Sequence, residues 1–403
     1  MALTESTVQS EQTAGGKRLD GIDLLRGLAI FFVLMNHVNI RLLGADVLYT
    51  RFLPEQLVHF LVWNGQLGVQ MFFAVSGFLI TSITLRRWGS LAAVSLRGFY
   101  LLRFARIAPL LLLLLAILSG LHFAGIHHFV VPAKTGGLGR ALLAALTFHI
   151  NVLEARKGYL PGNWDILWSL SVEEVFYLFF PIVCWIFGRG KLRKLFYAIL
   201  FSLVVLGPFG RTVFAHGNEI WEEYSYLGGM EGIALGCFTA LIVSRTRFSR
   251  AALWGLGVGG AAIVACSLVF SWQAYRGWPG RTGLNMTILA FGTCMFIAAT
   301  AQAGWRSPGW LRPLLKIGQY SYEVYLTHMF VVFGFFGLFL DVGKPMRLVP
   351  VLFVATILVS GLLGAAVSGL YSEPANRFLR GGFGDKGGKL TPAAEPAQTI
   401  DET

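Results

Sequence analysis

The chain has 403 residues, of which 55% are hydrophobic and only 13% are charged, and its mean hydropathy is +0.63. A soluble protein of this size would carry roughly twice that charged fraction, so the composition excludes an ordinary soluble domain. The formal net charge of +12 does not indicate nucleic-acid binding, because the basic residues stand in short stretches between apolar runs, where they set membrane topology.

Repeated apolar runs of about 20 residues predict an all-α, polytopic membrane protein, because about that many helical residues cross a bilayer. The predicted spans are 24–40, 66–85, 107–125, 166–187, 195–215, 227–244, 251–271, 284–303, 318–340 and 348–371. We expect a membrane-embedded domain over 19–380, between disordered cytoplasmic segments at 1–18 and 381–403. No additional soluble domain is expected.

The apolar run 138–153 leaves the number of spans open, because it is short and contains His149 and Asn151. If it does not cross the membrane, about two thirds of the 33 Lys and Arg residues lie on the cytoplasmic side. The positive-inside rule therefore favours a re-entrant or surface segment here. The result is ten spans with both termini in the cytoplasm.

The four cysteines lie inside apolar runs and do not have the spacing of metal ligands. We interpret them as small packing residues, and we predict neither a disulfide nor a metal site.

The first span carries two residues that are costly to bury in a bilayer, Arg26 and His37. Eleven residues separate them, so their side chains share one helix face about 16 Å apart along the axis. Asp23 precedes Arg26 by three residues and can pair with it. Ionisable groups at this depth suggest a functional site, although a snorkelling Arg and a hydrogen-bonded structural His would also explain them.

Two other spans bring ionisable residues to a similar depth: Glu173 and Glu174 in the fourth span, and His328 in the ninth. Counting about 1.5 Å per residue from the span ends predicts His37, Glu173 and His328 at one level, slightly outside the midplane. Convergence from three spans favours a site. Structural roles remain open for Glu173, as a partner that holds helices together, and for His328.

A second cluster is predicted nearer the cytoplasm. Arg103 and Arg106 stand three residues apart at the start of the third span, and Arg26 lies at a similar depth. Guanidinium groups on one face bind phosphate oxygens well. The alternative is that these arginines only anchor the cytoplasmic end of the span, which requires no ligand. Combined with an upper His and Glu site, the arginines predict a dock for a donor that carries several phosphates. Glu323, near the same surface, is expected to be structural or solvated.

These residues occur in motifs that resemble those of the acyltransferase family 3 membrane proteins. Arg26 and His37 form an Arg-x10-His motif in DLLRGLAIFFVLMNH, and Arg103 and Arg106 stand in RxxRIxP. Glu173 matches the acidic position in WSLSVEEVFYLFFP. The other matching stretches are VQMFFAVSGFLIT, IGQYSYEVYLTH and YSEPANR. The resemblance covers roughly 19–377, and it also implies ten spans.

The resemblance implies transfer of an acyl group, often acetyl, from cytoplasmic acyl-CoA to a hydroxyl of an outward-facing glycan or lipid-linked sugar. The expected location is the bacterial inner membrane, with lipids and these two substrates as partners and without nucleic acid or metal. Some members acylate macrolides or other small molecules instead. Others carry an extracytoplasmic esterase-like domain, which this chain is expected to lack, so that it would deliver the acyl group alone.

On this hypothesis Arg26, Arg103 and Arg106 hold the phosphates of CoA, and His37 is the general base on the acceptor hydroxyl. Glu173 would fix the tautomer of His37 and stabilise its imidazolium. The expected substrate contacts are His328, Glu174, Trp164 and Asn163. Interfacial anchoring is an alternative role for Trp164.

Two alternatives stay open at this stage. The acyl group could pass transiently through a His or Ser, such as Ser76 in VSGF. A transporter or flippase for a charged small molecule or glycolipid would also carry Arg, His and Glu at mid-membrane, although no internal repeat is evident.

Overall fold

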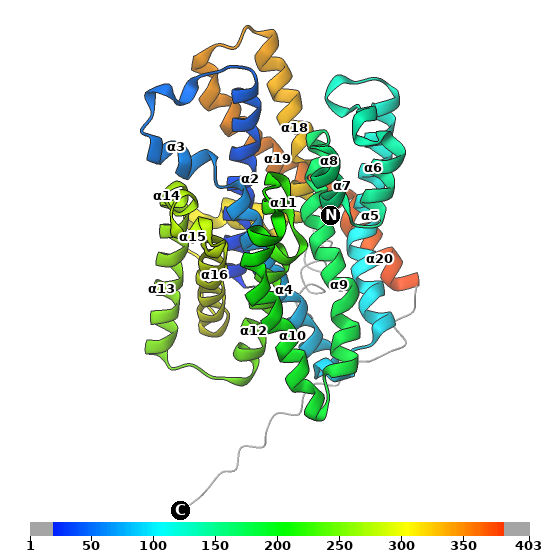
Figure 1. The fold of residues 1–403 in the computed structure, drawn as a ribbon, viewed down its shortest axis with the longest axis vertical. Coiled ribbons are helices and arrows are strands. Elements are labelled where there is room, and N and C mark those ends of the chain that lie inside the picture. The colour runs from blue at the N-terminus through cyan, green and yellow to red at the C-terminus, as the bar shows by residue number, and fades with distance from the viewer. Residues whose placement is uncertain (1–18, 383–403) are drawn as a thin grey trace, which may run out of the picture.

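The computed structural model describes residues 19–382, so the segment 1–18 and nearly all of 381–403, both predicted to be disordered, lie outside the described residues. The described part is all-helical and contains no strand (Figure 1). Its helices are α2 (Asp20–Gly44), α3 (Glu55–Val62), α4 (Gly65–Trp88), α5 (Leu96–Phe123), α6 (Gly137–Leu146), α7 (Ile150–Lys157), α8 (Gly162–Asp165), α9 (Leu167–Phe187), α10 (Arg193–Arg211), α11 (Glu219–Tyr224), α12 (Tyr226–Arg245), α13 (Arg250–Val269), α14 (Ser271–Arg276), α15 (Trp278–Arg281), α16 (Leu284–Ala303), α17 (Arg312–Gln319), α18 (Ser321–Asp341), α19 (Val349–Val367) and α20 (Glu373–Gly382). A π-helical turn, Ser368–Ser372, joins α19 to α20.

Ten helical stretches of the described chain are long and apolar enough to cross a membrane, as predicted. Between α5 and α9 the chain forms short helices instead, and the pair His127–Thr135 and Gly137–Leu146 is bent by 94°. α6 has 10 residues, which is about 15 Å of helix and half of the hydrocarbon thickness. This length fits the re-entrant or surface segment that the sequence predicts.

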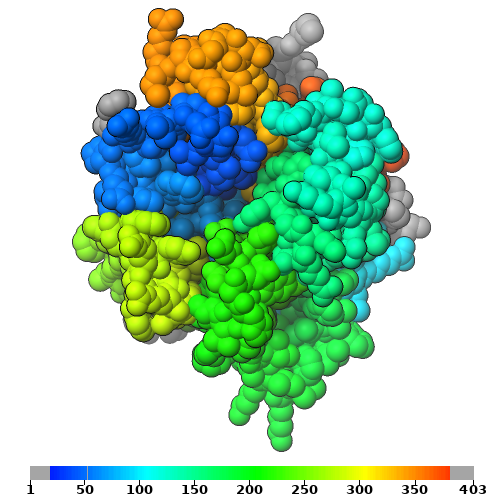
Figure 2. All heavy atoms as spheres, turned by 45° about the horizontal axis from the view of Figure 1, so that its top comes forward, coloured from blue at the N-terminus to red at the C-terminus, as the bar shows by residue number. Residues whose placement is uncertain are grey.

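Two connections rich in basic residues lie at the same end of the bundle. The α9–α10 and α12–α13 connections both turn at the lower end of Figure 1. Their basic residues are Arg189, Lys191, Arg193, Lys194, Arg245, Arg247 and Arg250. These two connections are among those that the expected topology places in the cytoplasm. The opposite end is built by α3, α6–α8 and α11, and Figure 2 shows where these segments meet.

Glycines let the central helices approach backbone to backbone. A Cβ atom on Gly77 of α4 would lie 1.8 Å from the carbonyl oxygen of Ile233 in α12, and one on Gly236 would lie 2.0 Å from that of Ala74. Neither position accepts any side chain. Small residues at crossings are the usual way to pack helices closely in a bilayer, where the hydrophobic effect does not drive helices together.

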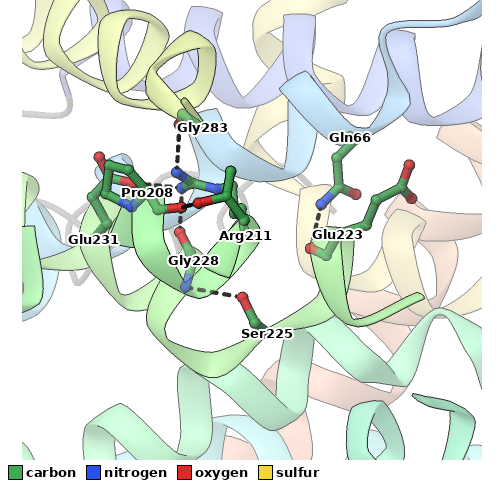
Figure 3. A network of polar contacts seen from close by, with 9 residues as sticks. Gln66, Pro208, Arg211, Glu223, Ser225, Gly228, Glu231 and Gly283 are labelled. Atoms are coloured by element: carbon green, nitrogen blue, oxygen red, sulfur yellow. Dashed lines mark hydrogen bonds and ion pairs between the residues drawn. The ribbon is translucent and has the colours of Figure 1, made fainter. Parts of the chain in front are cut away.

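A buried ion pair ties α10 to α12 and α16 (Figure 3). The guanidinium of Arg211 lies 2.5 Å from Glu231 Oε2, and it donates to the carbonyl oxygens of Gly283 (3.0 Å) and Gly228 (2.5 Å). Glu231 is fully buried. The two buried charges are therefore paired, Arg211 is also hydrogen-bonded to the backbone, and the network is structural.

Candidate active site

The face of α2 that carries Arg26 and His37 lies against α18. Arg26 Nε donates to Ser321 Oγ at 3.0 Å, and His37 Nδ1 lies 2.8 Å from His328 Nε2. Both contacts advance in the same direction along the two helices, so α2 and α18 run parallel. The predicted shared face of Arg26 and His37 is confirmed, and it points into the bundle. Ser321 and His328, seven residues apart, form the matching face of α18.

The hydrogen bonds of the histidine pair fix the proton positions in its neutral form. His328 Nδ1 lies 2.6 Å from the carbonyl oxygen of Tyr325, which can only accept, so this nitrogen carries the proton. His328 Nε2 is then a lone pair, and His37 Nδ1 must donate to it. The Nε2 atom of His37 is left as a bare lone pair without a hydrogen-bond partner in the described chain. His328 is fully buried, whereas His37 is only partly buried.

A cavity of about 380 Å³ lies among α2, α4, α5, α9 and α18. Its lining includes Arg26, Arg103, Arg106 and Glu173. Tyr325 lines the cavity as well, and it precedes His328 by one helical turn. The cavity therefore extends from the arginines to the vicinity of the histidine pair. It is large enough for part of a small-molecule ligand.

Two of the cavity arginines are held by carboxylates. Arg103 Nη2 lies 3.1 Å from Glu174 Oε1, and its guanidinium is 3.8 Å from the ring centroid of Tyr177. Arg106 Nη1 lies 3.0 Å from Glu323 Oε1. Glu323 was expected to be either structural or solvated, and because it is buried and paired its role is structural. The arginines are thus positioned before any ligand binds. Among the described residues, Arg103 Nε is buried without a hydrogen-bond partner.

The position of the two arginines differs from the expectation. α5 begins at Leu96, nearly three turns (about 2.8) before Arg106, so both Arg103 and Arg106 lie well inside the helix. The predicted span began at Ile107 because the preceding charges interrupt the apolar run. Arg26 behaves as expected, with its guanidinium 4.0 Å from the Asp23 carboxylate.

Glu173 is not the partner of His37, and this expectation requires correction. It lines the arginine cavity, while His328 forms the hydrogen bond to His37 Nδ1. The depth count assumed that all spans begin at one membrane level. In Figure 1, α9 begins well below the upper end of α2, because α6–α8 precede it at that end. Glu173 therefore lies lower than the count predicts.

The expected substrate contacts are less open than the sequence suggested. Both ring nitrogens of His328 and one carboxylate oxygen of Glu174 are bound to other residues. Asn163 and Trp164 in α8 are fully buried, and within the described structure their side-chain polar atoms have no hydrogen-bond partner. Ser76 lines the arginine cavity, where its hydroxyl contacts that of Tyr177.

Ten membrane-length helices around an internal polar site define a multi-pass membrane protein. Residues 19–367 match the acyltransferase 3 family, described as an acyltransferase domain, and the chain belongs to this family. The resemblance seen in the sequence motifs is therefore confirmed.

Curated relatives carry more specific names. The chain is 25% identical over 337 residues to O-acetyltransferase OatA of Staphylococcus aureus (strain NCTC 8325 / PS 47), a match that covers 81% of this chain and 52% of the relative. It is 26% identical over 329 residues to peptidoglycan O-acetyltransferase OatA of Listeria monocytogenes, covering 77% and 49%. The chain thus spans about half the length of these relatives. No solved structure matches it.

Proposed function

We propose that the chain transfers an acyl group, acetyl in the first instance, from cytoplasmic acyl-CoA to a hydroxyl on the outer side of the bacterial inner membrane. The observation that carries the proposal is the His37–His328 pair next to an arginine-lined cavity. The relatives named O-acetyltransferase support acetyl, and the one named peptidoglycan O-acetyltransferase supports a glycan acceptor, either polymeric or lipid-linked. Cytoplasmic termini are part of this proposal.

The arginine cavity is the proposed donor site. Arg26, Arg103 and Arg106 line it together with Glu173. Their partner carboxylates, Asp23, Glu174 and Glu323, lie outside the lining, so the guanidinium groups are the cationic part of the wall that an anionic ligand would meet. Guanidinium groups bind phosphate oxygens through paired hydrogen bonds, and the free, buried Arg103 Nε offers one such donor. These residues would hold the phosphates of CoA, whose narrow pantetheine arm fits a cavity of about 380 Å³.

The histidine pair supplies the chemistry. As the acceptor oxygen attacks the thioester carbonyl carbon, His37 Nε2 takes the hydroxyl proton. The C–S bond then breaks, and the proton passes from His37 to the leaving thiolate. His328 acts as a positioning residue: its Nε2 lone pair keeps the proton of His37 on Nδ1 and stabilises the imidazolium while it exists. Glu173 and Glu174 orient the arginines, and Asn163 and Trp164 remain proposed contacts of the acceptor.

The test is turnover by the purified protein in proteoliposomes that are supplied with radiolabelled acetyl-CoA and a glycan acceptor. The proposal predicts label covalently attached to the acceptor and free CoA in equal amount. Uptake of label without a covalent product would favour a transporter and overturn the proposal. In cells, the surface-glycan mass with and without the gene identifies the acyl group and the acceptor together.

A further inference from the structure

A chain of polar side chains leads from His37 to the end of the bundle that carries α3, α6–α8 and α11. Arg41 follows His37 by one turn on the same face of α2. Its guanidinium lies over the ring of Phe333 at 5.2 Å, and its charge acts on the Asp165 carboxyl at the end of α8. Asp165 in turn accepts a hydrogen bond from the Tyr224 hydroxyl at 3.0 Å. The transfer chemistry proposed above uses none of these three polar groups.

Asp165 faces a second carboxyl group, that of Glu154 in α7. Glu154 is fully buried, and its Oε1 accepts the backbone N–H of Leu160 at 2.9 Å. Its carboxyl group also forms a side-chain hydrogen bond with that of Asp165. Burial, together with the neighbouring Asp165, raises the pKa of Glu154 well above its ordinary value. Glu154 is therefore the neutral member of the pair, and Asp165 carries the negative charge.

The cluster continues to the surface through aromatic residues. Tyr224 stacks on Trp168 with ring centroids 4.2 Å apart, and Tyr159 meets Tyr224 edge-on at 6.1 Å. Tyr159 is the aromatic residue of the cluster that reaches the surface, because 55% of the residue is exposed. Glu223 and Asp165 lie near the Tyr159 hydroxyl, and burial followed by these charges raises its pKa to about 12.

α11 is fixed beside this cluster. Gln66 at the start of α4 donates to the carbonyl oxygen of Glu223 at 2.8 Å, and Asn218 donates to that of Ala155 in the neighbouring α7 at 2.7 Å. In Figure 3 the Glu223 side chain extends away from the Arg211 network. Figure 2 shows the same end of the molecule, where α2 and α3 (blue), residues 127–165 (cyan to green) and α11 (green) meet.

Two polar side chains of this cluster lack hydrogen-bond partners among the described residues. Asn163 and Trp164 immediately precede Asp165, are fully buried, and have no hydrogen bond to their amide or indole atoms in the part of the chain described. Buried polar atoms without partners are costly, and a ligand is one way to satisfy them. The amide of Asn163 and the indole N–H of Trp164 offer donors and an acceptor to a molecule rich in hydroxyl groups.

We infer that this cluster is an acceptor subsite for an uncharged, hydroxyl-rich sugar, held by Asp165 and Arg41 and stacked on Tyr159. Arg41 lies one turn from His37, so a sugar bound here reaches the proposed base with one hydroxyl. The charges of Asp165, Glu223 and Glu219 all act on the Tyr159 hydroxyl, and they outnumber that of Arg41. The subsite therefore disfavours sugars that carry carboxylates. The acylation of the sugar hydroxyl rests on the proposed function, whereas the binding of the sugar at this cluster does not.

The experiment measures binding and transfer separately. The full-length protein in nanodiscs is titrated with a neutral N-acetylglucosamine oligomer and with a uronic-acid oligomer of equal length, and CoA binding is measured in parallel. Asp165→Asn removes the charge while retaining the shape, and Tyr159→Ala removes an exposed ring without risk to the core. Trp310→Ala is the matched control, since Trp310 is 77% exposed and lies in the segment before α17.

We expect the wild-type protein to bind the neutral oligomer at least tenfold more tightly than the acidic one. Both variants should weaken this binding about tenfold and leave CoA binding unchanged, whereas the control should match the wild type. Equal binding of the two sugars, binding of neither, or variants that match the wild type would overturn the inference. Sugar binding that the variants weaken, without transfer to any acceptor, would retain the subsite and overturn the acyl-transfer function instead.

Discussion

His37 Nδ1 and His328 Nε2 lie 2.8 Å apart, and this hydrogen bond joins α2 to α18 beside the end of the arginine cavity. The carbonyl oxygen of Tyr325 sets the direction of this hydrogen bond, because it fixes the proton on His328 Nδ1 and leaves His328 Nε2 as the acceptor. A lone pair on His37 Nε2 follows from these contacts, and it is the property that a general base requires. The pair also explains why two histidines stand at one depth in separate helices.

His328→Leu should lower kcat for acyl transfer by roughly 10²-fold, because His37 loses the acceptor that holds its tautomer. His328→Gln should retain more activity, since its side-chain oxygen can accept from His37 Nδ1. KM for the donor should stay unchanged in both variants. Steady-state kinetics in proteoliposomes provides the measurement, and His127→Leu, at an exposed position, is the control. Equal loss in the Leu and Gln variants would contradict the tautomer role.

Arg103→Gln should raise the Kd for CoA about tenfold, since one charge-assisted phosphate contact is lost. Glu174 then lacks its partner, so Arg103→Gln/Glu174→Gln serves to separate donor binding from the stability of the pair. Binding of CoA by isothermal titration is the measurement. Arg97→Gln, near the start of the same helix, is the control. An unchanged Kd in both Arg103 variants would remove the donor site from this cavity.

Arg211→Ala should destabilise the protein by about 3–5 kcal/mol, because it leaves the buried Glu231 carboxylate unpaired. Arg211→Ala/Glu231→Gln should recover part of this loss, since the uncompensated charge is removed. Thermal unfolding in detergent measures the effect, and Arg245→Ala, which removes an exposed arginine of α12, is the reference. A double variant no more stable than Arg211→Ala would mean that Glu231 is not charged.

Glu154 gives the stability a pH dependence of known sign. Because its pKa is raised in the folded protein, the neutral form contributes stability that is complete below the ordinary carboxyl pKa. That contribution is lost as the pH rises through the raised pKa. Glu154→Gln should therefore match the wild type at about pH 5 and unfold at a higher temperature at about pH 9. Parallel melting curves across this range would contradict the neutral state of Glu154.

The sequence was sufficient for the features that depend on periodicity within one helix. The eleven-residue spacing of Arg26 and His37 predicts their common face, and both residues contact α18. The apolar runs likewise predict ten spans. The contact of Ser321 with Arg26 was missed, although its seven-residue spacing from His328 is a signal that could have revealed it.

Features that depend on how helices pack against one another could not be predicted from the residue spacing within a single helix. Glu173 lies in the arginine cavity because α9 begins below the end of α2, and hydropathy contains no information about relative height. The partners of Arg103 and Arg106 come from two different helices, α9 and α18. The cluster of Glu154, Asp165 and Tyr224 forms only because short, non-spanning helices fold over one end of the bundle.

The most direct test of the account is the rate of acetyl transfer by the His37→Ala variant in proteoliposomes, with CoA binding and thermal stability measured on the same sample. The account predicts a rate at least 10²-fold below that of the wild type, with CoA binding and stability retained. Transfer at a rate close to the wild type would show that His37 is not the base, and it would contradict the mechanism built on the histidine pair.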